Sequence, residues 1–244
     1  MNVKELYAYL NNRISPELSE DWDNDGRMII SCNKEVRKVL ISLDVTTQAV
    51  TEAIKGGYDL ILTHHPMIFK PIKGITDEKI LSLIKADISV FSFHTRLDTV
   101  EGGVNDALAS LLGLSNIEPF EEMGRTGELS NEMAANEFAL FVKHILGCPT
   151  LNYIKGNKKI KKVALLGGGG KDFWQKACEI SDAYITGEMS YNTLLDAHEK
   201  NFTVIEAGHY YTEFPVCKVL QALVTEADSK IETKIFDFYP VTSI

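Results

Sequence analysis

The chain has 244 residues, of which 45% are hydrophobic and 24% charged, an ordinary composition for a globular protein of one large or two small domains. Asp and Glu outnumber Lys and Arg by 34 to 25, and the resulting net charge of −9, without a basic stripe, argues against nucleic-acid binding. The start of the chain lacks the basic and apolar regions of a signal peptide, and no apolar run approaches the roughly 18 residues that span a bilayer. We therefore expect a cytoplasmic protein with no membrane partner.

The cysteines Cys32, Cys148, Cys178 and Cys217 are widely spaced and form no C-x-x-C pair. This spacing argues against a zinc finger and against a disulfide framework. We expect reduced, buried thiols.

Strands and helices alternate in the first half of the chain. Apolar residues at helical spacing predict a helix over 3–12, and a polar turn around Trp22 follows at 20–26. Strands are predicted at 39–44, 59–63 and 88–93, and helices from 46, over 79–85 and over 104–112. This alternation predicts a mostly parallel sheet with helices on its faces.

A segment rich in Glu, Gly and Ser at 115–130 predicts a domain boundary, with one domain over 1–125 and a second over 126–244. One alternative stays open, in which the C-terminal segment packs back on the first domain. The second half is also α/β. Its helices are predicted at 132–146, 171–180, 190–199 and 212–227, and its strands at 163–166, 183–186, 202–205 and 233–238.

Four histidines are predicted to end strands. His64 and His65 follow the apolar run Leu60-Ile61-Leu62 and precede Pro66, which cannot donate to a sheet. His94 ends another strand and His209 follows a third, so the four could face one cleft at the carboxyl ends of parallel strands. His144 and His198 lie in helix-like stretches and are expected to be ordinary residues.

Carboxylates follow two of these histidines at the same spacing, in His94-x-x-x-Asp98 and His209-x-x-x-Glu213. On a helical turn, positions i and i+4 share one face. The mixed set of His64, His65, Asp98, His209 and Glu213 suits zinc, iron, manganese, cobalt or nickel better than calcium. A single catalytic zinc ion takes about three protein ligands. This larger set therefore fits two divalent metal ions better than one.

A glycine run at 167–170, followed by Lys171 and Asp172, is expected between a strand and a helix. It matches neither the P-loop, which needs an earlier glycine and a Ser or Thr after the lysine, nor the dinucleotide fingerprint. A tight turn and a phosphate-binding turn both remain open interpretations.

Motifs that resemble one known family run along nearly the whole chain. They are Asp21-Trp22-Asp23-Asn24-x-Gly26, Asp59-Leu60-x-x-Thr63-His64-His65-Pro66, His94-Thr95-x-Leu97-Asp98, Gly102-Gly103-Val104-Asn105-Asp106-x-Leu108, Gly124-Arg125-x-Gly127-Glu128-Leu129, Thr186-Gly187-Glu188 and Ala207-Gly208-His209-Tyr210-x-Thr212-Glu213. With them the chain resembles the GTP cyclohydrolase 1 type 2 homologue family, the Nif-three-like proteins with dinuclear metal centres, in its compact version without an inserted domain.

The resemblance implies two similar three-layer α/β/α domains with a metal site at their interface, and a homohexamer. It implies that His64, His65, Asp98, His209 and Glu213 bind the two metals, with Glu213 bridging them. His94 would be a further ligand, a supporting partner or a proton relay. Asp25 and Arg27 stand where apolar residues are expected, so the tryptophan turn is expected to pack differently.

Three functions fit such a site. The first is a metal-dependent hydrolase of the GTP cyclohydrolase type, acting on a nucleotide or related heterocycle: water activated by the metals would attack C8 of the purine of GTP and release formate. The second is a metal-dependent phosphoesterase. The third is a non-enzymatic, metal-stabilised oligomeric scaffold or regulatory protein.

Overall fold

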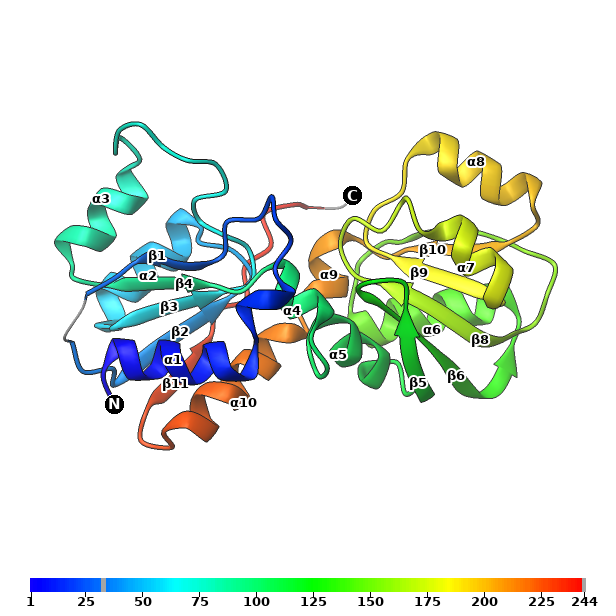
Figure 1. Ribbon diagram of the computed structural model, residues 1–244. Coiled ribbons are helices and arrows are strands. Elements are labelled where there is room, and N and C mark those ends of the chain that lie inside the picture. The colour runs from blue at the N-terminus through cyan, green and yellow to red at the C-terminus, as the bar shows by residue number, and fades with distance from the viewer. Residues whose placement is uncertain (32–33, 243–244) are drawn as a thin grey trace. The chain divides into compact units, whose positions relative to one another are not determined.

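The computed structural model describes residues 1–31 and 34–242 and divides the chain into two compact units (Figure 1). Unit 1 contains Met1–Val100 and Val216–Pro240, and unit 2 contains Glu101–Pro215 with Val241 and Thr242. The predicted boundary between 125 and 126 falls inside a strand of unit 2, and the last helix and strand of the chain belong to unit 1.

The sheet of unit 1 has the strand order β1-β4-β3-β2-β11. Its strands β2, β3, β4 and β11 are mutually parallel, and β1 pairs antiparallel with β4. Their bounds are β1 (Gly26–Ile29), β2 (Lys38–Ser42), β3 (Leu60–Thr63), β4 (Ser89–Ser92) and β11 (Glu232–Ile235). Every residue of β3 is buried, as its apolar run predicts for a central strand.

Helices cover both faces of this sheet, as Figure 1 shows. On one face lie α1 (Val3–Arg13) and α10 (Val216–Ala227), and on the other lie α2 (Thr47–Gly56) and α3 (Glu78–Lys85). A short 3-10 helix, η1 (Pro16–Leu18), and the five-residue α4 (Thr95–Thr99) complete the unit. The predicted three-layer α/β arrangement of the first half is confirmed.

The sheet of unit 2 has the order β5-β6-β8-β9-β10-β7. Strands β8, β9 and β10 are parallel, whereas β5, β6 and β7 pair antiparallel with their neighbours. The bounds are β5 (Ser115–Phe120), β6 (Gly124–Met133), β7 (Asn152–Ile154), β8 (Ile160–Leu166), β9 (Ala183–Thr186) and β10 (Thr203–Glu206).

The antiparallel strands of unit 2 were not predicted, because they carry no apolar run. β5 and β7 are edge strands that leave most residues partly or fully exposed. β6 does bury its first residues, but these include the polar Arg125 and Thr126. The buried charge of Arg125 is neutralised by a bidentate ion pair, in which Arg125 donates to the Asp106 carboxylate of a neighbouring helix at 2.9 and 2.7 Å.

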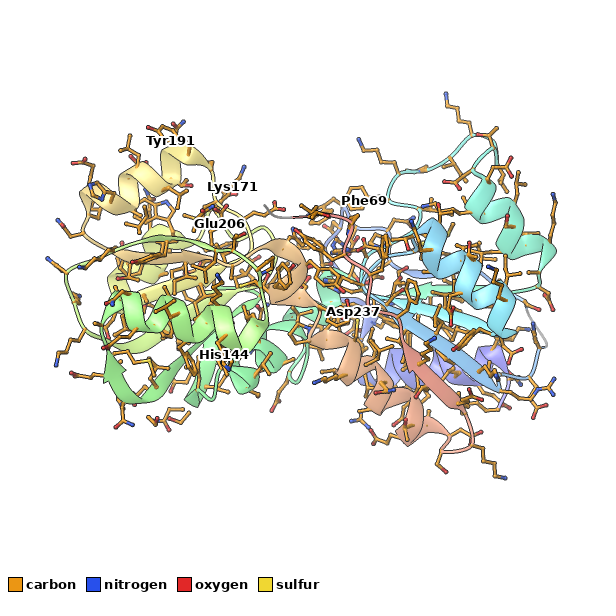
Figure 2. The ribbon with its side chains drawn as sticks, turned by 180° about the vertical axis from the view of Figure 1, so that it is seen from behind. Phe69, His144, Lys171, Tyr191, Glu206 and Asp237 are labelled. Carbon is orange, nitrogen blue, oxygen red and sulfur yellow. The ribbon has the colours of Figure 1, made fainter. Side chains whose placement is uncertain are left out.

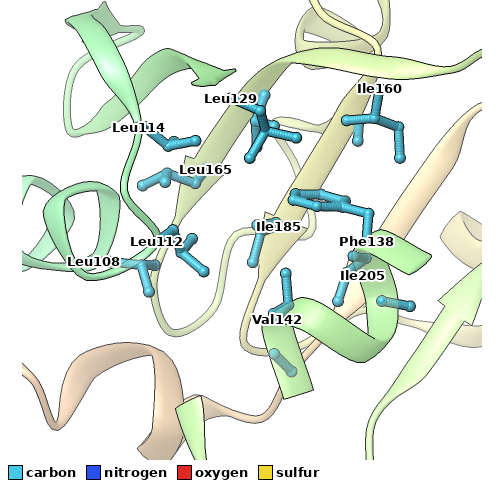
Figure 3. Close-up of a cluster of buried hydrophobic side chains, with 14 of the residues drawn as sticks. Leu108, Leu112, Leu114, Leu129, Phe138, Val142, Ile160, Leu165, Ile185 and Ile205 are labelled. Carbon is cyan, nitrogen blue, oxygen red and sulfur yellow. The ribbon is translucent and has the colours of Figure 1, made fainter. Parts of the chain in front are cut away.

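Helices also flank both faces of the unit 2 sheet. α5 (Val104–Leu111) and α6 (Ala135–Leu146) cover one face, and α7 (Trp174–Ile180) and α8 (Tyr191–Glu199) cover the other. Figure 3 shows the buried cluster beneath α6, where Phe138 and Val142 pack against Leu165, Ile185 and Ile205 of the parallel strands. The second half is therefore α/β in three layers as well.

The single helix predicted over 212–227 is two helices. α9 (His209–Glu213) ends before Pro215, and α10 begins at Val216. Proline lacks the amide hydrogen that would continue the helix ladder. The break coincides with the passage of the chain from unit 2 to unit 1.

The thiols of Cys148, Cys178 and Cys217 are free, and Cys148 and Cys217 are buried. Cys32 lies outside the described residues. In the described part of the chain, none of the helices combines the length and apolar character needed to cross a bilayer.

Candidate metal centre

The buried strand β3 positions the histidine pair. Thr63, its last residue, shares a hydrogen bond of 2.9 Å with Ser92 of β4 and donates through its hydroxyl to the His65 carbonyl. The His65 amide donates to the Leu43 carbonyl, which extends the parallel ladder by one residue. The sheet thus fixes the backbone of the pair, and His64 itself is 0% exposed.

Each histidine of unit 1 directs its Nδ1 at an acceptor. His64 Nδ1 donates to the Phe93 carbonyl at 2.9 Å. His65 Nδ1 donates to Asp44 Oδ1 at 2.8 Å, and His94 Nδ1 donates to Asp23 Oδ1 at 2.9 Å. Carbonyl and carboxylate oxygens only accept, so the hydrogen lies on Nδ1 and the neutral ring carries its lone pair on Nε2. This is how metal-binding histidines are oriented in proteins.

The three imidazoles converge. Their ring centroids lie 4.9 Å apart for His64 and His65, 5.3 Å for His64 and His94, and 5.8 Å for His65 and His94. One nitrogen from each ring lies within 4.8 Å of the others. Clustered nitrogen donors with fixed tautomers are what a borderline divalent ion requires.

Asp98 joins this group from α4. Its Oδ1 lies 3.6 Å from His64 Nε2. A neutral His64 would therefore aim a lone pair at an anionic oxygen, an arrangement that a cation between the two groups stabilises. The donor set of unit 1 fits a divalent metal on this ground.

Unit 2 holds a second group of candidate ligands. His209 begins α9 after Gly208, and Glu213 follows one turn later, so the predicted i, i+4 placement on one face is observed. His209 Nε2 lies 3.0 Å from Glu213 Oε2, and its Nδ1 lies 3.1 Å from Glu188 Oε1. Glu213 is 5% exposed.

The glycine run of unit 2 makes room for this group. Gly168 has φ +66°, and a Cβ there would overlap the Glu213 carboxylate and lie 3.2 Å from His209 Nε2. The Gly168 amide donates to the Thr212 hydroxyl at 3.0 Å. The lack of a side chain at Gly168 thus lets the backbone of this turn approach the side chains of Glu213 and His209.

Sequence reasoning missed the supporting carboxylates Asp23, Asp44 and Glu188. Asp23 and Glu188 lie in quoted motifs, but no role was predicted for them, and Asp44 had no signal beyond its place after β2. Burial acts to raise the pKa of Asp23, but the hydrogen bonds that it accepts from His94 and Thr95 outweigh burial and lower it. Asp23 is therefore an anionic acceptor that orients His94.

Two departures from the family pattern, Asp25 and Arg27, lie in the tryptophan turn. Asp25 accepts a hydrogen bond of 2.8 Å from Nε of Arg96, which is 1% exposed, so this departure from the family pattern is a buried ion pair. Arg27 is exposed and lies over the ring of Tyr7 at 5.0 Å.

The predicted site residues thus form one group in each unit. His64, His65, His94 and Asp98 belong to unit 1, and His209 and Glu213 belong to unit 2.

Comparison with known proteins identifies the family. Residues 1–240 match the Duf34/NIF3 (NGG1p interacting factor 3) family. The chain belongs to this family. A protein of Clostridium perfringens named GTP cyclohydrolase 1 type 2 homolog is 35% identical over 248 residues, which cover 95% of each chain. A protein of Helicobacter pylori named GTP cyclohydrolase 1 type 2 is 35% identical over 220 residues, 86% of each chain.

Solved structures of other proteins have a fold similar to that of this Duf34/NIF3 chain. The crystal structure of a hypothetical protein from Staphylococcus aureus is similar to it with a TM-score of 0.92 and 26% identity, covering 100% of this chain and 99% of that one. The predicted family and α/β fold class are therefore confirmed.

Proposed function

We propose that this Duf34/NIF3 protein binds two divalent metal ions per chain and is a hydrolase of the GTP cyclohydrolase type, acting on a nucleotide or related heterocycle. The observation that carries the metal proposal is the histidine triad of unit 1, in which each Nδ1 donates to an acceptor and one nitrogen of each ring lies within 4.8 Å of the others. The names of its Clostridium and Helicobacter relatives support the reaction class.

His64, His65 and Asp98 in unit 1, with His209 and Glu213 in unit 2, would hold the ions. Bound there, divalent ions would supply Lewis-acid polarisation and lower the pKa of water. The chain's own carboxylates keep the imidazole tautomers: Asp44 holds His65, and Asp23 holds His94. His94 would either be a further ligand through Nε2 or hold and move a proton there during the reaction.

Elemental analysis of the purified protein tests the metal proposal. We expect about two equivalents of divalent metal per chain, as for dinuclear hydrolases, and a clear loss in the His64→Ala variant. His144→Ala is the matched control, because His144 is an exposed histidine on α6 (Figure 2). Equal metal content in both variants would overturn the proposed ligands.

Incubation of the metal-loaded protein with GTP tests the reaction. We expect formate and a fluorescent pterin from the wild type and neither from His64→Ala. Release of inorganic phosphate without formate would contradict cyclohydrolase chemistry and identify a phosphoesterase.

We also propose that the protein assembles as a homohexamer, on the basis of its family resemblance. Light scattering of the purified protein measures this directly, and a monomeric mass would refute it.

A further inference from the structure

Two aromatic side chains next to His94 are exposed to solvent. Trp22 is 60% exposed and Phe69 is 47% exposed. Their ring centroids lie 6.0 Å apart with the ring planes inclined by 52°, and each centroid lies 6.2 Å from that of the His94 imidazole. Large apolar side chains grouped on a surface mark binding sites more often than isolated ones do.

Hydrogen bonds hold the turn that carries Trp22. The Asp23 amide donates to the Glu20 carbonyl at 2.9 Å, and the Glu20 amide donates to the Thr95 hydroxyl at 3.0 Å. The Asp23 carboxylate accepts from the amide and hydroxyl of Thr95 and from His94. Residues before and after Trp22, namely Glu20 and Asp23, are thereby hydrogen-bonded to the segment that carries His94.

The same turn holds the loop of Phe69, which is labelled in Figure 2. The side-chain amide of Asn24 donates to the Ile68 carbonyl, directly before Phe69. Both aromatic residues therefore sit on backbone that is fixed relative to His94. Such preorganisation lowers the entropic cost of binding a ligand.

We propose that Trp22 and Phe69 form an aromatic platform for a planar nitrogen heterocycle of the purine or pterin class, which stacks on the face of one ring and contacts the other, inclined ring beside His94. This inference rests on the proposed function and extends it, since it assigns recognition of the substrate to the ring rather than to a phosphate. Aromatic side chains bind bases through their π-faces whatever the base. Lys70 and Lys73 lie in the same loop as Phe69 and are exposed. Their positive charges would attract an anionic group attached to such a ring.

Tryptophan fluorescence tests the platform. The chain has two tryptophans, of which Trp22 is exposed and Trp174 is 4% exposed, so Trp22 dominates the long-wavelength emission. Guanosine and GTP should each quench this emission saturably, in metal-loaded protein and in protein treated with a chelator. Inorganic triphosphate should not quench it.

Phe69→Ala should weaken guanosine binding about 5- to 100-fold, the range found when a stacking side chain is removed, and should leave the metal content unchanged. Ile75→Ala is the matched control, because Ile75 is a 49% exposed apolar residue of the same loop and should bind guanosine as the wild type does. Calorimetry with Trp22→Ala, in which the fluorescent signal is lost, should show a similar weakening.

The platform is refuted if guanosine does not bind, if triphosphate alone produces the quenching, or if Phe69→Ala binds guanosine as tightly as Ile75→Ala. A change in oligomeric mass of Phe69→Ala with unchanged guanosine binding would also refute it and identify the pair as a subunit contact. If the purified wild-type protein contains no metal, the proposed function is refuted but the platform is not. The guanosine titration of chelator-treated protein then still decides whether the heterocycle binds.

Discussion

At the scale of single residues, the candidate metal ligands depend on neighbouring groups that hold their side chains in place. Asp23, Asp44 and the Phe93 carbonyl each fix the tautomer of one histidine in unit 1. In unit 2, the absence of a side chain at Gly168 leaves space for Glu213. These neighbours can be tested separately from the ligands.

We expect Gly168→Ala to weaken metal binding by about 10-fold or more, as supporting residues of metal sites commonly do. The added Cβ would overlap the Glu213 carboxylate, and alanine is disfavoured at a φ of +66°. Titration with a metal-sensitive dye measures the affinity. Gly169→Ala is the control, since a Cβ there meets nothing within 4 Å. Equal affinities of the two variants would contradict the assigned role of Gly168.

The buried Arg96 should dominate the stability of the tryptophan turn. Arg96 donates to Asp25 at 2.8 Å and to the Asn11 side chain at 2.7 Å. Arg96→Ala leaves the Asp25 charge without this partner, and we expect it to lower the free energy of unfolding by about 3–5 kcal/mol. Urea denaturation measures the loss.

Arg27→Ala is the control for Arg96. Arg27 is exposed and only stacks over Tyr7, so its removal should cost less than about 1 kcal/mol. A loss for Arg96→Ala no larger than that of Arg27→Ala would show that the buried pair does not stabilise the turn.

At the scale of elements, strands with apolar runs were predictable and strands without them were not. β3 buries all its residues and was found from Leu60-Ile61-Leu62. β5 and β7 are exposed edge strands, and β6 buries Arg125 through its pair with Asp106, so their sequences resemble loops. Such strands form because a neighbouring strand or helix pairs with their backbone and side-chain polar groups. The hydrophobic periodicity of the sequence carries no information about these partners.

The reactivity of Cys217 tests how firmly helix α10 packs in unit 1. Its residue Cys217 is buried, and burial raises the pKa of the thiol to about 12. The thiolate is the reactive form, so at pH 8 only about 1 in 10,000 of these thiols would be ionised. We expect iodoacetamide to leave Cys217 unmodified in the folded protein and to alkylate it in urea, as measured by peptide mass spectrometry.

Cys178 of α7 is the internal comparison, because its side chain is partly exposed and should react in the folded protein. Alkylation of Cys217 as fast as that of Cys178 under native conditions would mean that α10 opens readily from unit 1.

At the scale of the whole molecule, metal binding should contribute to stability. A ligand that binds only the folded state stabilises it by about 2.7 kcal/mol at 100 times its dissociation constant. We therefore expect a chelator to lower the melting temperature of the wild type, and added zinc or manganese to restore it, in differential scanning fluorimetry.

His64→Ala separates this effect from general effects of the chelator, since the variant should show little change on chelation. An equal shift in the variant and the wild type would contradict stabilisation through His64. Light scattering in the same samples shows whether metal removal dissociates the protein, the result expected of a metal-stabilised scaffold.

The sequence by itself determined the α/β class, the ends of most central strands and the histidines at those ends. These features follow from local patterns: apolar runs mark buried strands, helical spacing marks helices, and proline marks where either stops. The i, i+4 placement of His209 and Glu213 on one face was predictable for the same reason.

Only the tertiary structure decided which groups meet across long stretches of chain. Asp23 reaches His94, Asp44 reaches His65, and Thr212 binds the amide of Gly168, each across at least 21 residues. The sequence left open whether the C-terminal segment packs back on the first domain, and only the structure places residues 216–240 in unit 1. Such pairs depend on strand order and on the satisfaction of buried polar groups, and both are properties of the folded chain rather than of any segment.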